Sequence, residues 1–130
     1  MNLQSTDPEY TQRLGAFLEE VRNEPDSMLE PTTRWLAILA TLTGSGSVDA
    51  YKEALPQALQ EGLDPVAVKE MVYQATDYLG YGRALPFLHA TNDALTAAGI
   101  ALPLPGQATT TMNDRLEKGI AAQVLSLIHI

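Results

Sequence analysis

The stretch 64-DPVAVKEMVYQATDYLGYGR-83 decides the fold class of this chain. Asp64-Pro65 predicts a helix start, because aspartate accepts hydrogen bonds from free backbone N–H groups and proline fits the first helical position. Beyond it, apolar residues recur at helical spacing, at positions 68, 71, 72, 75, 78 and 79. Gly80-Tyr81-Gly82 predicts a tight turn after which the next helix folds back. The stretch therefore predicts two helices packed side by side.

The neighbouring segments also predict helices. Pro31 opens the segment 32-TTRWLAILATLTG-44, whose residues 35–42 are almost all apolar, so we expect it to be the central and most buried helix. A further helix is expected over 49–60, bent near Pro56 and ended by Gly62. The helix that begins at Arg83 is expected to close at Gly99. Since no alternating, strand-like pattern occurs, we predict an all-α fold, an antiparallel bundle of about six helices.

The two ends of the chain divide it into three regions. Residues 1–29 form an N-terminal helix and linker, in which Asp7-Pro8 marks the start and an apolar stripe follows at positions 14, 17, 18 and 21. Residues 30–99 form the helical core. Residues 100–130 form a proline-rich connector, which we expect to be extended, and a helix from residue 112 onward.

Composition limits the classes of partner. The 130 residues fit one domain, and the net charge of −8 makes nucleic acid and anionic membranes poor partners. No run of 18 apolar residues occurs, and the polar N-terminus lacks the apolar region of a signal peptide. The chain has no cysteine, which excludes disulfides and thiol chemistry within it. We therefore expect a cytoplasmic protein that spans no membrane.

Residues 30–98 resemble the carboxymuconolactone decarboxylase family, which includes the alkylhydroperoxidase D-like proteins. The resemblance rests on the order and spacing of four features. These are Thr33-Arg34 before an apolar helix, Ala58-Leu59 shortly before Gly62, Glu70 in the following helix, and the pattern Tyr78-x-Gly80-x-x-Arg83. It implies an all-α bundle that self-associates, usually as trimers or hexamers, with peroxidase-type or lactone decarboxylase activity and no cofactor.

The catalytic positions of that family are replaced in this chain. In peroxidase-type members, a thiolate attacks peroxide and a second thiol resolves the sulfenic acid, while a histidine and a glutamate handle protons. Aligned on the resemblance, the two cysteine positions fall on Ser47 and Ala50, the histidine position on Ala54 and the glutamate position on Trp35. Decarboxylase-type members keep the histidine, so Ala54 counts against that activity too. We expect a scaffold that serves assembly rather than turnover, although whether the chain is an enzyme stays open.

Three other residues are weak catalytic candidates: Glu70, His89 and Tyr78. For Glu70 the main alternative is a structural ion pair, with Arg83 or near Lys69, and for His89 it is a half-buried or interface position. Tyr78 could line a ligand cavity together with Tyr73 and Tyr81, but such aromatics more often pack in a core. Two histidines leave no usual transition-metal site, so no metal is expected.

Three functions remain in competition. The first is a family member whose repeat in this chain is inactive, and whose partner is another copy or a second repeat of the same family. The second is a non-enzymatic domain that binds a small aromatic or lactone-like ligand or a partner helix, and the third is a cofactorless enzyme that polarises a lactone with Tyr and Glu. We expect the native protein to continue past Ile130 into a second repeat, because 109-TTTMNDRLEKGIAAQ-123 resembles the linker helix that leads to a second copy in two-repeat members of the family. The family pattern would continue where the chain stops, at 124-VLSLIHI-130, and SLIHI resembles a translated sequencing adapter. His129 lies in this tail and receives no role.

Overall fold

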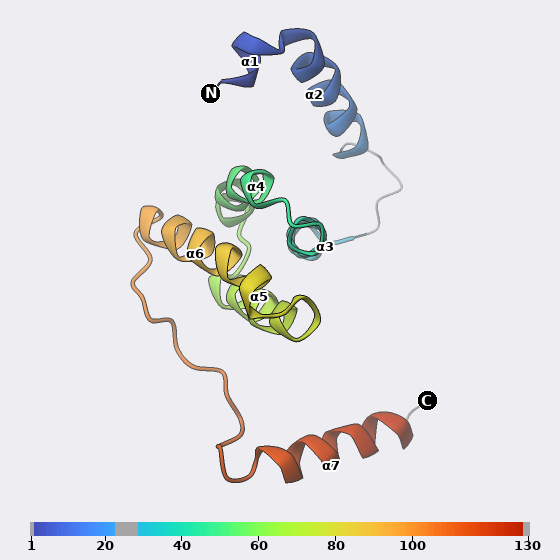
Figure 1. Cartoon of the computed structure of the whole chain (residues 1–130), viewed down its shortest axis with the longest axis vertical. Coiled ribbons are helices and arrows are strands. Elements are labelled where there is room, and N and C mark those ends of the chain that lie inside the picture. Colours follow the sequence, from blue (N-terminus) through green and yellow to red (C-terminus); the bar gives the residue numbers. More distant parts are fainter. Residues whose placement is uncertain (1, 23–28, 129–130) are drawn as a thin grey trace.

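The computed structural model describes residues 2–22 and 29–128, and in these residues the chain forms seven α-helices and no β-strand (Figure 1). The all-α prediction is therefore confirmed for the described part of the chain. The helices are α1 (Leu3–Thr6), α2 (Pro8–Arg22), α3 (Pro31–Gly44), α4 (Val48–Gln60), α5 (Pro65–Leu79), α6 (Tyr81–Ala97) and α7 (Arg115–Ile128).

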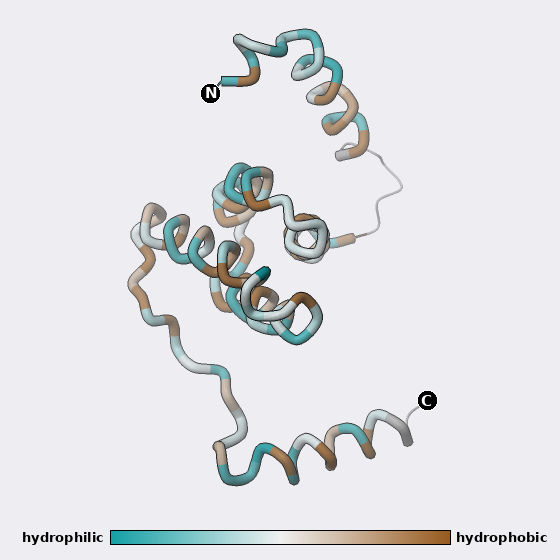
Figure 2. The backbone as a smooth tube through the Cα atoms, viewed as in Figure 1, coloured by the Kyte–Doolittle hydropathy of each residue, from teal (hydrophilic) through white to brown (hydrophobic). Residues whose placement is uncertain are grey.

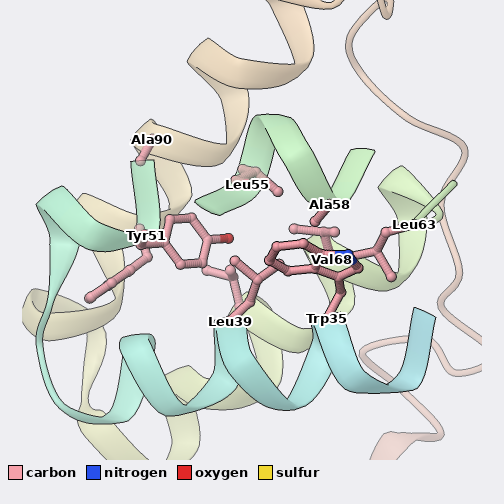
Figure 3. Packing of buried hydrophobic residues seen from close by; sticks show 10 residues of the cluster. Trp35, Leu39, Tyr51, Leu55, Ala58, Leu63, Val68 and Ala90 are labelled. Carbon is pink, nitrogen blue, oxygen red and sulfur yellow. The ribbon is translucent and has the colours of Figure 1, made fainter. Parts of the chain in front are cut away.

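Four helices, α3 to α6, enclose the hydrophobic core. Helix α3 packs on α4 and α5, and α6 packs on the same two helices from the other side, so the four form a closed ring of contacts. The fully buried large side chains are Leu39, Tyr51, Leu55, Val68, Val72, Phe87 and Leu95. Figure 3 shows Tyr51, Leu39, Leu55 and Trp35 meeting between the helices. No helix in the described ranges has both the length and the apolar character needed to cross a bilayer.

The ends of the core helices follow the predicted turn chemistry. Asp64 caps α5 by accepting a hydrogen bond from the Val66 N–H at 3.1 Å. Helix α4 ends at Gly62, where φ is +94° and the N–H groups of Gly62 and Leu63 return to carbonyls of the last turn. Gly99 closes α6 in the same way, with φ of +76°. These three signals were read correctly from the sequence.

The expected turn at residues 80–82 is shorter than predicted. Only Gly80 separates α5 from α6, and both Tyr81 and Gly82 belong to α6. Gly80 has φ of +81° and ψ of 152°, a combination that is essentially restricted to glycine. The chain therefore reverses direction at the single residue Gly80, whereas the sequence predicted a turn of three residues. Helix α7 likewise begins at Arg115, later than the predicted residue 112.

The prediction that the helix over 32–44 is the most buried one is wrong. In α3 only Trp35, Leu39 and Thr43 are buried, whereas α6 buries five residues. Ala37 and Ala40 are exposed, and Ile38, on another side of the helix, is 37 % exposed. The apolar composition of α3 thus includes side chains that the described residues do not cover.

Helices α1, α2 and α7 lie outside the four-helix core (Figure 1). The predicted stripe on α2, formed by Leu14, Phe17, Leu18 and Val21, is 40–59 % exposed instead of packed in the bundle. Leu116, Ile120 and Val124 of α7 are exposed too. Figure 2 shows these apolar positions along helices that stand apart from the core.

The solvent-accessible surface of the chain is larger than that of a compact monomer of the same mass. The chain exposes 9809 Å². A compact monomer of 14.1 kDa exposes about 6,700 Å², so this chain exposes roughly 3,100 Å² more than a compact monomer of its mass. The exposed helices α2 and α7 and the exposed connector between α6 and α7 contribute to this surplus.

Candidate functional site

An apolar groove runs along the open face between α3 and α5, with a volume of about 640 Å³. Its residues recur every three or four positions on each helix, so one stripe of each helix faces the groove. The lining residues are Thr33, Leu36, Ala37, Ala40, Thr43 and Gly44 of α3, and Ala67, Glu70, Met71, Gln74, Ala75, Tyr78 and Leu79 of α5. We call this feature the α3/α5 groove.

Two of the three weak catalytic candidates, Glu70 and Tyr78, line this same groove. Glu70 is half-buried and is its one charged lining residue. The predicted ion pair is wrong, since among the described residues Glu70 lies within 4 Å of neither the Arg83 guanidinium nor the Lys69 ammonium. Tyr78 lies at the C-terminal end of α5 and is 89 % exposed. The pair resembles the edge of a binding surface more than an enclosed acid–base site.

The third candidate, His89, lies elsewhere. It is exposed on α6 and lines neither the α3/α5 groove nor the two other cavities described below. The half-buried position predicted for it is therefore wrong, while the interface role stays a prediction. The structure does not bring His89 together with Glu70 or Tyr78.

The preference for placing the tyrosines in the core is also wrong. Tyr73, Tyr78 and Tyr81 are all exposed. Each lies on the side of α5 or α6 that faces away from the core, because both helices fill their inner faces with smaller side chains such as Val72 and Ala84. The buried tyrosine is Tyr51 of α4.

A second cavity, of about 390 Å³, lies between α5 and the connector. It is lined by Val66, Lys69, Glu70 and Tyr73 of α5 and by residues 104–108. Lys69 is only 9 % exposed; its Nζ donates to Asn92 Oδ1 at 2.6 Å and lies 5.4 Å from the centre of the Tyr73 ring. The burial of Lys69 was not predicted from the sequence. The one signal for it was the position of Lys69 directly after Val68, which belongs to the apolar stripe of the helix.

A third cavity, of about 560 Å³, lies where the C-terminal ends of α4 and α6 meet. It includes Pro56 and Leu59 from one side and Ala94 and Ala97 from the other. Its one ionisable lining residue is Asp64, whose carboxylate caps α5. Since Asp64 has no second ionisable side chain beside it in the lining, this cavity contains no acid–base pair.

The positions that the family resemblance marks as catalytic lie at the start of α4. Ser47 Oγ is 2.8 Å from Ser45 Oγ, Ala50 is exposed, and Ala54 packs against the core. Neither serine hydroxyl meets a histidine or carboxylate in the described hydrogen bonds, so neither has a base that could activate it. None of the three cavities is lined by these residues.

Trp35, at the fourth of these positions, is buried and makes a long-range contact. Its Nε1–H donates to Glu61 Oε2 at 2.7 Å, and Gln57 Nε2 donates to Glu61 Oε1 at 3.0 Å. Glu61 is itself exposed at the end of α4. A carboxylate does lie beside Trp35, and it comes from the end of α4. The indole that binds it is a hydrogen-bond donor only and does not act as an acid or a base at ordinary pH.

A buried polar pair lies inside the core. Tyr51 Oη is 2.8 Å from Thr91 Oγ1, and Thr91 Oγ1 donates its one proton to the Phe87 carbonyl. Tyr51 must then donate to Thr91. Burial raises the pKa of Tyr51 above its usual value, partly offset by the hydrogen bond to Thr91. The phenol is thus neutral and structural.

The described residues contain no group of three or more His, Asp or Glu side chains that could hold a metal ion. Comparison of the chain with protein-family models, with curated proteins and with solved structures gave no match.

Proposed function

We propose that this chain is a non-catalytic assembly module of the carboxymuconolactone decarboxylase type, which associates with other copies of itself through the α3/α5 groove. The observation that carries the proposal is this uncovered groove, in which a single charged residue, Glu70, stands among mainly apolar and small side chains. Apolar surface of this extent favours association, because covering it removes it from water.

The surface surplus supports the same function. The exposed excess is roughly 3,100 Å² per chain, or about 6,200 Å² for two copies. Obligate homodimers bury roughly 2,000–5,000 Å² in total, so covering part of this excess would be enough. The α3/α5 groove and the exposed helices α2 and α7 together thus offer enough area for a stable assembly.

The chemistry at the start of α4 argues against turnover by this chain. The two serines there contact each other rather than a base, and the chain has no cysteine that could attack a peroxide. The buried Tyr51 and Trp35 are committed to structural hydrogen bonds. An inactive repeat that supports assembly fits these residues better than the peroxidase or the lactone decarboxylase.

Two measurements test the proposal. Light scattering after size-exclusion chromatography should give a mass above 14.1 kDa for the chain, and Ala40→Glu should reduce it to that of a monomer by placing a charge in the groove. Ala50→Glu is the matched control, because Ala50 is exposed on α4 outside the groove. A peroxide assay with a dithiol reductant should give no turnover above the blank. A monomeric chain, or measurable turnover, would overturn the proposal.

A second candidate function is the binding of a small ligand in the cavity beside Lys69. The buried ammonium has one neutral acceptor, Asn92, and lies among the apolar side chains of Val66 and Leu104. Nuclear magnetic resonance titration with benzoate, compared with neutral benzamide, tests this function. Shifts confined to Val66–Tyr73 for benzoate would favour it, and equal or absent shifts would exclude it.

A further inference from the structure

Helix α2 carries an apolar stripe that nothing in the described chain covers. Leu14, Phe17, Leu18 and Val21 follow one another at steps of three, one and three, and Tyr10 extends the same face by one turn. All five side chains are exposed. Such a face is stable in water only at a cost, so it is typical of a helix that docks on a partner.

The stripe matches the α3/α5 groove in length. From Tyr10 to Val21 the stripe covers about 17 Å of helix axis at 1.5 Å per residue. The groove runs from Thr33 to Gly44 on one side, about 17 Å, and from Ala67 to Leu79 on the other, about 18 Å. Helix α7 runs from Arg115 to Ile128 and is of similar length, so length does not separate the two helices. Helix α2 fits the whole groove in length, and side-chain size is the feature that favours it.

The two surfaces are also complementary in side-chain size. The groove floor includes Ala37, Ala40, Ala67 and Ala75, which leave room for a third helix to approach closely. The stripe on α2 presents large side chains, with Phe17 near its middle. Large side chains of one helix entering the space above small residues of two others is the usual way in which helices interlock.

We propose that α2 of a second copy of this chain docks in the α3/α5 groove, and that the two copies exchange their α2 helices about a two-fold axis. This inference rests on the proposed function, since it names the partner for the same groove. In a two-fold exchange each copy fills the groove of the other, which leaves no unpaired stripe or groove at either end.

The single chain leaves its own groove open while presenting the matching helix apart from the core (Figure 1). The eight residues between Arg22 and Pro31 span at most about 30 Å, which lets α2 reach a neighbouring copy that lies close to α3. Exchange of two α2 helices would cover part of the roughly 3,100 Å² of excess surface that each chain exposes.

The first test compares two substitutions on opposite faces of α2. Leu18→Ser removes a large side chain from the stripe, while Gln12→Ser changes the opposite face and is the control. In sedimentation equilibrium, Leu18→Ser should weaken association at least about tenfold and Gln12→Ser should leave it unchanged. Equal association of both variants in an assembly would overturn the docking of α2 while leaving the proposed function intact.

The second test uses the absence of native cysteine. Chains carrying Phe17→Cys are mixed with chains carrying Ala40→Cys and treated with a short bifunctional maleimide. These two positions lie near the middle of stripe and groove, so they come close whichever way α2 runs. We expect cross-links between unlike chains, and none when Lys52→Cys, exposed on α4, replaces Ala40→Cys.

The remaining outcomes separate the two proposals. A monomeric chain would overturn the proposed function, and the docking of α2 with it. A cross-link that forms only within one chain carrying both Phe17→Cys and Ala40→Cys would show that α2 fills its own groove, which overturns exchange between copies.

Discussion

Replacing Tyr51 by phenylalanine removes one hydroxyl group from the core and tests the buried hydrogen-bond chain directly. The hydroxyl donates to Thr91 Oγ1, whose own proton goes to the Phe87 carbonyl. The aromatic ring would stay, since it packs edge-on against Phe87 with centroids 5.2 Å apart and planes at 86°. The substitution therefore isolates the hydrogen bond from the packing.

At pH 7 we expect Tyr51→Phe to lower the free energy of unfolding by about 1–2 kcal/mol. The loss combines one net hydrogen bond with the cost of leaving the Thr91 oxygen without its donor in a buried position. Threonine keeps its bond to Phe87, so the loss stays below that of a core truncation.

The pH dependence follows from the raised pKa of Tyr51. Because the folded state holds the phenolic proton more strongly than the unfolded state, the stability it supplies is full below the unfolded pKa of about 10. It is lost as the pH rises from there towards the folded pKa. The native chain therefore begins to lose this stability as the pH rises above about 10.

Urea unfolding at pH 7 and at steps between pH 9 and 11, followed by circular dichroism, measures both effects. The two proteins differ only at residue 51, so the difference in free energy of unfolding isolates the Tyr51 hydroxyl. We expect the native chain to be more stable at pH 7 and the gap to narrow as the pH rises above about 10. A gap that does not change with pH, or no gap at pH 7, would refute the reasoning.

Three further predictions concern stability. Leu39→Ala should lower the free energy of unfolding by about 2–5 kcal/mol because Leu39 is fully buried, whereas Ile38→Ala, at a partly exposed position of α3, should cost less in the same urea experiment. Gly80→Ala should cost about 1–3 kcal/mol through backbone strain alone, since a Cβ there meets no atom within 4 Å, and unchanged thermal unfolding would contradict this. Hydrogen bonds from Lys118 and from the Thr111 N–H hold the pKa of Asp114 below its usual value. This contribution to α7 is therefore present above the unfolded pKa and is lost as the pH falls through the folded pKa. Amide protection factors in α7, which correct for the intrinsic exchange rate at each pH, should fall on acidification below about pH 4, and Asp114→Asn should remove that dependence.

Local chemistry made much of the fold predictable from the sequence. Asp64-Pro65, Gly62 and Gly99 each satisfy backbone groups at a helix end, which is a short-range requirement that the sequence states directly. The same holds for the apolar spacing of α5. These features need no knowledge of which helix packs on which.

The errors arose where a pattern has two physical outcomes. An apolar helix can be central or can carry apolar side chains outside the core, and α3 is the second kind, since Leu36, Ala37 and Ala40 line the α3/α5 groove. The stripe of α2 likewise identified an apolar face correctly but not what covers it. Periodicity gives the face of a helix and leaves its partner undetermined.

The candidate site was predicted only in part. Glu70 and Tyr78 share a groove because both lie on the outer stripe of α5, a spacing visible in the sequence. The contact between Trp35 and Glu61 joins residues far apart in the chain, and the burial of Lys69 depends on Asn92 of another helix. Contacts of this kind depend on tertiary packing, which no local pattern encodes.

The proposal that this chain assembles through its open face is tested most directly by sedimentation of the unmodified chain over a range of concentrations. We expect a mass that is a multiple of 14.1 kDa and falls towards a single chain on dilution. A mass of one chain at every concentration would contradict the proposal.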